Sequence, residues 1–162
     1  MKEKYMEIAL RQASKAYDLN EIPVGAVIVK DDQIISKAYN VKEKNNDPCG
    51  HAEIRAIKKA CKKLNSWRLD DCEMYVTLEP CLMCAGAIIH SRIKKIYIGT
   101  LDNKTGAIIS KAKVFNEYIV NHKVDYEYGI MQKECSNILK DFFKLLRKVK
   151  KEKDLWKIIM LY

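Results

Sequence analysis

The sequence lacks a long hydrophobic run, although 48% of its 162 residues are hydrophobic. No stretch reaches the roughly 20 consecutive apolar residues that a membrane-spanning helix needs. The N-terminal Met1–Lys4 is charged and leads into an amphipathic pattern, unlike the apolar segment of a secretory signal. We therefore expect a globular protein that does not associate with membranes and that works in the cytoplasm.

Repeats, low-complexity tracts and linker-like stretches are also missing. A chain of this length suits one domain with a sizeable core. We expect a single domain over residues 1–148, followed by a basic and apolar tail over 149–162 that is not a separate domain.

The six cysteines do not form the pattern of a disulfide framework. A domain of this size does not need cross-links, and Cys81 and Cys84 have the spacing of metal ligands. The other four are expected to be reduced, partly buried small residues: Cys49, Cys61, Cys72 and Cys135.

Two short stretches carry the chemistry: His51-Ala52-Glu53, and the Pro80–Cys84 segment with sequence PCLMC. Zinc favours nitrogen and sulfur ligands in a tetrahedron. Cys81 and Cys84 are three residues apart, so one helical turn places both thiols on the same side. His51 supplies a third ligand, which leaves the fourth position for water, as in catalytic zinc sites.

Glu53 lies two residues from the histidine and serves in this interpretation as the base that takes a proton from that water. An H-x-E motif followed by P-C-x-x-C is the known signature of zinc-dependent nucleobase deaminases. Two alternatives remain open: a redox C-x-x-C, and a structural zinc whose fourth ligand is Cys49 or another cysteine.

Hydrophobic periodicity predicts strands that alternate with helices. Residues 41–50 and 100–113 are expected to be loops, and Val114–Val120 a short helix, although Tyr118–Val120 also suits a strand. The predicted helices are 3–19, His51 to at least Ala60, Cys81 to about Ser91 and Ile130 to about Lys148, and the predicted strands are Ile22–Val29, Ile34–Asn40, Glu73–Leu78, Lys95–Gly99 and residues 124–128.

This order predicts an α/β protein with three layers, α/β/α, around a mixed, mostly parallel five-stranded sheet. Both metal-binding stretches begin a helix just after a strand or loop, and His51 and Glu53 are expected in the first helical turn. Ligand sites in α/β sheets favour that end of the strands.

The net charge of +9 favours a polyanionic partner. A lysine-rich solvated surface would give the same charge without any such partner.

From about Met6 to Arg147 the chain resembles the bacterial tRNA-specific adenosine deaminases, which have the cytidine deaminase-like fold. The resemblance is carried by Pro23–Val27, Asn40, Asp47-Pro48, His51–Ile54, Trp67-Arg68-Leu69, Tyr75–Cys81, Met83–Ile88, Ser91-Arg92-Ile93, Asp102, Lys104–Ala107, Asn121-His122, Glu134-Cys135, Phe142-Phe143 and Arg147.

The resemblance implies hydrolysis of adenosine to inosine at the tRNA wobble position, by a homodimer that binds the anticodon stem-loop and one Zn²⁺ per subunit. It implies that His51, Cys81 and Cys84 hold the metal and that Glu53 moves the protons. Asn40, Val24 and Gly50 match positions that contact the target nucleoside. Asn40 also suits a turn after a strand, and Val24 also suits a strand core.

Further along the chain, Asp102, Lys104, Phe142 and Arg147 match positions near the RNA. The phenylalanine also suits core packing, and the basic residues also suit a solvated face.

The chain departs from the family pattern at Cys49-Gly50, where Thr-Ala is usual, and at Ile108-Ile109-Ser110, where a smaller, glycine-containing stretch is usual. The tail after Arg147 is also longer. Two rival functions stay open: a deaminase of free guanine, cytosine or nucleosides, and a non-catalytic RNA-binding module with a structural zinc.

Overall fold

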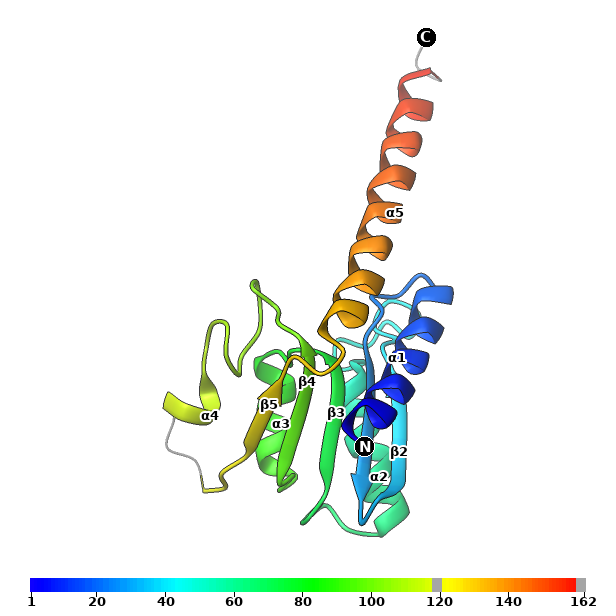
Figure 1. Cartoon of the computed structure of the whole chain (residues 1–162). Coiled ribbons are helices and arrows are strands. Elements are labelled where there is room, and N and C mark those ends of the chain that lie inside the picture. The colour runs from blue at the N-terminus through cyan, green and yellow to red at the C-terminus, as the bar shows by residue number, and fades with distance from the viewer. Residues whose placement is uncertain (118–120, 160–162) are drawn as a thin grey trace.

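The computed structural model describes residues 1–117 and 121–159, and Figure 1 shows the helices and strands within them. The helices are α1 (Lys2–Asp18), α2 (Ala52–Leu64), α3 (Leu82–His90), α4 (Val114–Glu117) and α5 (Gln132–Ile159), and the strands are β1 (Gly25–Lys30), β2 (Gln33–Tyr39), β3 (Glu73–Leu78), β4 (Lys95–Thr100) and β5 (Asp125–Tyr128).

The strands form one sheet in the order β2-β1-β3-β4-β5. β1 pairs antiparallel with β2 and with β3, whereas β3 with β4 and β4 with β5 are parallel pairs. Four strands therefore run in one direction and β1 runs against them. The prediction of a mixed five-stranded sheet is confirmed, with parallel pairing confined to β3, β4 and β5.

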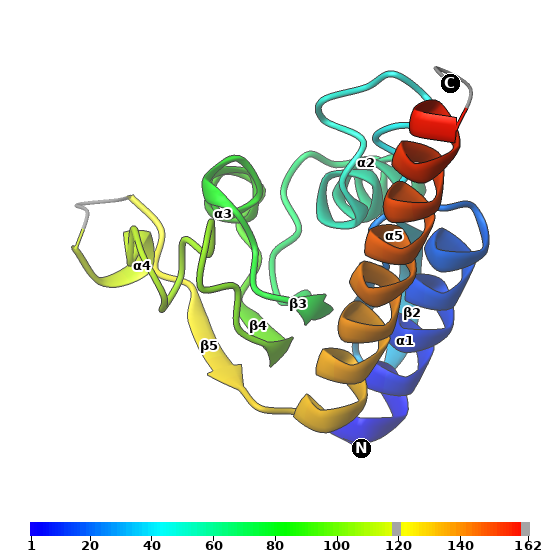
Figure 2. The same cartoon turned by 90° about the horizontal axis from the view of Figure 1, so that it is seen from above.

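Side chains of the strands alternate between two hydrophobic cores. Ala26 and Ile28 belong to the core under α2 and α3, whereas Val27 and Val29 belong to the core under α1. Figure 2 shows α2 and α3 over one face of the sheet and α1 and α5 over the other. The predicted three-layer α/β/α arrangement is confirmed.

α1 packs against β1 with almost no space at Gly25. An ideal Cβ atom at this position would lie 2.6 Å from the backbone nitrogen of Ala13 and closer still to the carbonyl oxygen of Ala9. The absence of a side chain at Gly25 lets the helix backbone rest directly on the strand, which begins beside the candidate site.

Several element boundaries differ from the sequence-based prediction by one or two residues, and three differences concern the site or the tail. β1 starts at Gly25, because Pro23 has no backbone N–H to offer a neighbouring strand. His51 is the N-cap of α2, with extended backbone, and not part of the first turn. α5 continues to Ile159, well past the predicted end near Lys148. The alternative strand at Tyr118–Val120 and the end of the tail, 160–162, lie outside the described residues.

The cysteines are free thiols in the described part of the chain. Cys72 and Cys135 are buried and Cys61 is half-buried, but Cys49 is exposed, contrary to the expectation of partial burial. No helix within the ranges described has both the length and the hydropathy of a membrane span.

Replacement of Gly25 by alanine tests the α1–β1 contact. The added methyl group must push the helix backbone away, so we expect Gly25→Ala to lower the free energy of unfolding by about 1–3 kcal/mol in urea titrations. Ser14→Ala, on the exposed side of α1, is the control and should change stability by less than about 0.5 kcal/mol. Equal stability of the two variants would contradict the tight packing.

Candidate active site

Three potential metal ligands converge where two helices begin. His51 caps α2, Cys81 caps α3, and Cys84 lies in the first turn of α3. The Nδ1 atom of His51 lies 3.6 Å from Sγ of Cys81 and 3.5 Å from Sγ of Cys84, and all three atoms lie within 4.8 Å of one another. The spacing prediction for these three residues thus agrees with their positions in space.

These separations fit a tetrahedral zinc ion. With Zn–N near 2.0 Å and Zn–S near 2.3 Å, tetrahedral angles require a nitrogen–sulfur separation of about 3.5 Å. Cys49 does not join the group, which consists of His51, Cys81 and Cys84 among the residues described. The residues present therefore fit a site with three protein ligands.

The protonation of the two thiols favours a cation between them. Hydrogen bonds from Cys84 and then His51, against the opposing effect of burial, lower the pKa of Cys81 to about 4. The same contact with Cys81, together with burial, raises the pKa of Cys84. The His51 pKa is raised mainly by its hydrogen bond to Cys81. A divalent cation at this position would be bound by two thiolates and one neutral imidazole.

Glu53 lies beside this cluster without belonging to it. Its side chain is only 3% exposed and occupies the first turn of α2, next to His51 and Cys84. Burial raises the pKa of this carboxyl, and the proximity of His51 opposes the shift. A carboxyl group with a raised pKa next to a group of potential metal ligands has the properties of a proton shuttle.

A cavity of about 380 Å³ opens above these groups. Val24 and Asn40 line it together with His51, Glu53 and Cys81. Gly50 is not among the lining residues. Its N–H group bonds to the carbonyl oxygen of Asp47 at 2.9 Å, so it closes the turn that leads into His51.

Asn40 is oriented by a buried carboxylate that sequence reasoning missed. Glu21 is 1% exposed and accepts hydrogen bonds from Nδ2 of Asn40 at 3.3 Å and from the backbone of Lys44 at 2.6 Å. Asn40 also donates to the carbonyl oxygen of Ile22. Both amide hydrogens are used, and Oδ1 accepts one long hydrogen bond from the backbone N–H of Lys42 at 3.4 Å, so Oδ1 is the atom of Asn40 that can still accept a bond.

Glu79 plays a similar role on the opposite wall and was also missed. This carboxylate is 2% exposed and accepts hydrogen bonds from the backbone N–H groups of Asp102, Ile108, Ile109 and Ser110 at 2.7–3.1 Å. Burial would raise its pKa, but a hydrogen bond from the Ser110 hydroxyl and these backbone bonds outweigh that effect and lower the pKa. The carboxylate therefore holds the loop that borders the cavity. Its place one residue before Pro80 was the available signal, although its partners lie far away in sequence.

Of the four residues predicted near RNA, three lie at the surface and one is buried. Asp102 and Lys104 lie in the loop at the cavity mouth, where the Asp102 carboxylate accepts bonds from the backbone N–H groups of Lys104 and Thr105. Arg147 is exposed on α5. Phe142, in contrast, is 3% exposed and packs edge-on against Tyr17, so its placement as an RNA contact is corrected to core packing.

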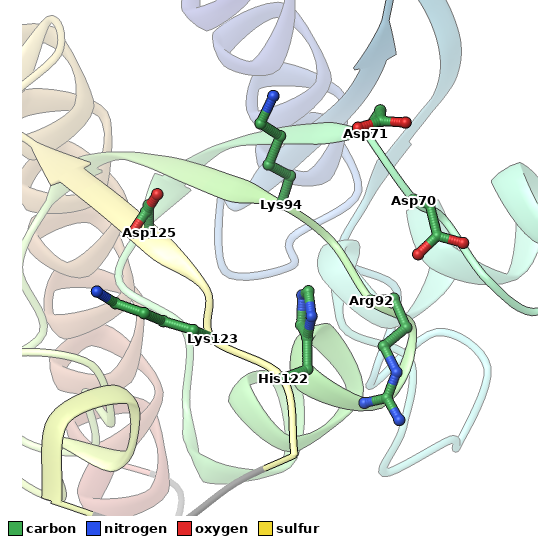
Figure 3. A pocket seen from close by; sticks show the side chains of 7 residues that line it. All are labelled: Asp70, Asp71, Arg92, Lys94, His122, Lys123 and Asp125. Carbon is green, nitrogen blue, oxygen red and sulfur yellow. The ribbon is translucent and has the colours of Figure 1, made fainter.

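A second cavity, of about 360 Å³, lies at the other end of the strands, where β3, β4 and β5 begin (Figure 3). Three of its lining side chains have partners: Asp70 pairs with Arg68, Arg92 bonds to Asn121, and His122 bonds to the carbonyl oxygen of Ile93 at 2.8 Å. This cavity shares no lining residue with the one above His51.

Glu79→Gln tests the anchoring of the loop. The amide NH₂ group of glutamine would face backbone N–H donors, so we expect a loss of about 1–3 kcal/mol in stability. Hydrogen exchange should accelerate at the amides of Ile108, Ile109 and Ser110. Glu43→Gln, at an exposed carboxylate, is the control, and unchanged exchange in Glu79→Gln would contradict the anchoring role.

Comparison with known proteins agrees with this geometry. The family described as MafB19-like deaminase matches residues 1–147. The chain is 48% identical over 146 residues to a tRNA-specific adenosine deaminase of Aquifex aeolicus, covering 90% of this chain and 96% of that protein. It is also 48% identical over 150 residues to the tRNA-specific adenosine deaminase of Haemophilus influenzae, covering 92% and 87%.

A solved structure from a study of A-to-I editing by tRNA:A34 deaminases at the wobble position is 40% identical in sequence to this chain and superposes on it with a TM-score of 0.82. The match covers 84% of this chain and 99% of the solved chain. Sequence, fold and site geometry thus agree, and the chain belongs to the family of tRNA-specific adenosine deaminases.

Proposed function

We propose that this protein converts adenosine to inosine by hydrolysis at the wobble position of tRNA. The observation that carries the proposal is the single cavity that brings Asn40 and Val24 over His51, Cys81 and the buried Glu53, in a chain of the tRNA-specific adenosine deaminase family. The overall reaction consumes one water and releases ammonia.

We propose Zn²⁺, one per chain, as the cofactor, held by His51, Cys81 and Cys84. Two thiolates and one imidazole suit zinc better than the oxygen-preferring cations. When bound, zinc supplies a Lewis acid that lowers the pKa of a coordinated water to about 7.

Glu53 carries the protons in this proposal. Its carboxylate takes one proton from the attacking water and delivers it to the ring nitrogen next to carbon 6 of adenine. After the carbon–oxygen bond has formed, Glu53 moves the second proton to the amino group, which leaves as ammonia when the carbon–nitrogen bond breaks. The raised pKa of Glu53 suits both the uptake and the release of a proton.

In this proposal, Asn40 and Val24 position the substrate. Oδ1 of Asn40 accepts a hydrogen bond from a donor of the nucleoside, and Val24 provides an apolar wall. Gly50 acts indirectly, through the turn that sets the position of His51.

RNA is favoured over a free base by the surroundings of the cavity. An outer hollow of about 680 Å³ adjoins the catalytic cavity above His51. The two share the lining residues Ile22, Leu78, Asp102 and Thr105. Lys104, Lys140 and Arg147 line this outer hollow. A free base would not extend to these cations, whereas phosphates next to a bound nucleotide would.

Comparison of substrates decides between the proposal and its main rival, a deaminase of free guanine, cytosine or nucleosides. The purified protein is incubated with an anticodon stem-loop RNA that has adenosine at the wobble position, and separately with adenosine, cytosine and guanine. Mass spectrometry should find inosine in the RNA at a rate that falls with salt. Deamination of a free base alone would overturn the RNA assignment.

We also propose a homodimer that acts in the cytoplasm, where tRNA is found. The outer side of α3 carries two exposed apolar side chains, Leu82 at 63% and Met83 at 36% exposure, directly beside Cys81. A second copy of the chain that covers this face would bury them. Light scattering should give twice the mass of the chain, and the mass of one chain would contradict the dimer.

The deaminase domain is proposed to span residues 1–148, with 149–162 as an appendage. Because α5 is continuous from Gln132 to Ile159, this boundary falls inside a helix.

Separate variants distinguish the metal ligands from the proton carrier. Glu53→Ala should retain zinc, because Glu53 is not a ligand, but should lower turnover by about 10²–10⁴-fold or more. His51→Ala should lower the zinc content as well as turnover. Metal content is measured by plasma mass spectrometry and turnover with the stem-loop RNA.

Cys49→Ser is the control, since this exposed thiol lies two residues from His51 and outside the ligand group. It should keep both zinc and activity. Inosine formation by Glu53→Ala at the wild-type rate would refute the role of Glu53, and loss of zinc in Cys49→Ser would point to a closed structural site.

A further inference from the structure

Three cations of α2 bond to the backbone of β2, the strand at one edge of the sheet. Arg55, Lys59 and Lys63 follow one another at intervals of four residues, so they share one face of the helix. Each donates a hydrogen bond to a carbonyl oxygen of β2. The acceptors are Tyr39 for Arg55, Lys37 for Lys59 at 3.1 Å, and Ile34 for Lys63 at 3.2 Å.

Arg55 is the member of this group nearest the active site. It lies four residues after His51 and two after Glu53 on the same helix. Its backbone N–H bonds to the carbonyl oxygen of His51 at 3.0 Å. Its half-buried guanidinium bonds to the carbonyl oxygen of Tyr39 and lies over the Tyr39 ring, 5.0 Å from the ring centre. One residue thus joins the start of α2 to the end of β2.

The carbonyl group that Arg55 binds belongs to the same peptide unit as the N–H of Asn40. That N–H donates to the carbonyl oxygen of Val24 at 3.1 Å. The N–H and C=O groups of a planar trans peptide point in opposite directions. The peptide unit between Tyr39 and Asn40 is therefore held from both sides, and the Cα atom of Asn40 is held with it.

We propose that Arg55 is a positioning residue for the deamination, and that it sets the place of Asn40 relative to His51 and Glu53. This inference rests on the proposed function. Glu21 fixes the side-chain amide of Asn40, whereas Arg55 fixes its backbone against the helix that carries the metal ligand and the proton carrier. Arg55 lines neither the catalytic cavity nor the outer hollow, so it acts through Asn40.

Removal of the guanidinium tests the proposal. Arg55→Met keeps a long side chain and a good helix former but has no donor for the Tyr39 carbonyl. Misplacement of a substrate-positioning group by about 1 Å can cost up to about 10²-fold in rate. We expect kcat/KM on the anticodon stem-loop to fall about ten-fold. The fall should lie in kcat, because phosphate contacts away from Asn40 dominate the affinity for RNA.

Two further variants separate positioning from general support of the helix. Arg55→Lys should restore most of the rate, since Lys59 and Lys63 show that a lysine on this face reaches a carbonyl of β2. Lys59→Met is the matched control, because it removes the same kind of bond one helical turn further from the site. It should lower the melting temperature about as much as Arg55→Met does and keep the wild-type kcat/KM. Both methionine variants should retain the wild-type zinc content.

A double-mutant cycle tests whether Arg55 acts through Asn40. Arg55→Met should lower kcat/KM no further when it is added to Asn40→Ala. NMR gives a readout that needs no substrate: the side-chain NH₂ signals of Asn40 should shift in Arg55→Met and stay in place in Lys59→Met. Unchanged Asn40 signals in Arg55→Met, or a further ten-fold loss of rate in the double variant, would overturn the proposal.

Three outcomes of the rate measurements decide the rest. Equal losses of kcat in Arg55→Met and Lys59→Met would mean that the helix is merely loosened, which overturns the positioning role. An unchanged kcat with a salt-dependent rise in the dissociation constant of the RNA would make Arg55 a phosphate contact instead. A wild type that deaminates no stem-loop RNA would overturn the proposed function itself, whereas a wild type that does so while Arg55→Met keeps its full rate would overturn only the role of Arg55.

Discussion

Two helix starts face each other at one end of the sheet, and the chemistry of the protein depends on that convergence. His51 precedes α2, while Cys81 and Cys84 begin α3. Both helices pack on the same face of the sheet through small and aliphatic side chains, including Ala52, Ala56 and Ile88. A shift of either helix by an ångström would spoil the separations of 3.5 and 3.6 Å between the imidazole and the thiols. The positive ends of the two helix dipoles also meet there, which favours thiolates and other anions.

The walls of the cavity are held by buried carboxylates instead of apolar packing. Glu21 fixes the amide of Asn40 and the start of the following loop, and Glu79 fixes the loop from Asp102 to Ser110. A buried carboxylate is costly unless its lone pairs are satisfied. Here backbone N–H groups satisfy them, so each loop is bound to the same carboxylate at several points. Rigid walls of this kind pre-organise a site without contributing to its chemistry.

Much of the site could be predicted because its residues are close in sequence. The spacing of His51, Glu53, Cys81 and Cys84 carries the chemistry by itself, and Val24 and Asn40 follow from the family resemblance. Glu21 and Glu79 could not be assigned, since their partners lie about 20–30 residues away and are backbone groups with no residue signature. Phe142 illustrates a different limit: a phenylalanine on an amphipathic helix serves the core or a ligand, and only burial decides.

The fold, like the site, could be predicted from the sequence only in part. The mostly apolar run Ile22–Val29, rich in β-branched residues, predicts a buried strand, and the turn signal at residues 30–33 predicts that Ile34–Asn40 pairs with it as a hairpin. The pairing of β1 with β3 did not follow from the order of elements, because the chain crosses from β2 through α2 and passes over β1 before β3 begins. The predicted end of α5 near Lys148 is too early, because the lysine-rich run after it has the composition of a tail but continues the helix to Ile159. The sequence from 130 to 162 contains neither glycine nor proline, and that absence was the available signal that the helix continues.

The central claim is that three protein side chains bind one zinc ion and leave its fourth position open. X-ray absorption at the zinc edge of the purified protein tests it most directly. The account predicts two sulfur atoms at about 2.3 Å and two nitrogen or oxygen atoms at about 2.0–2.1 Å, of which one comes from water. A shell with three or four sulfur atoms, or a purified protein that binds no zinc, would contradict it.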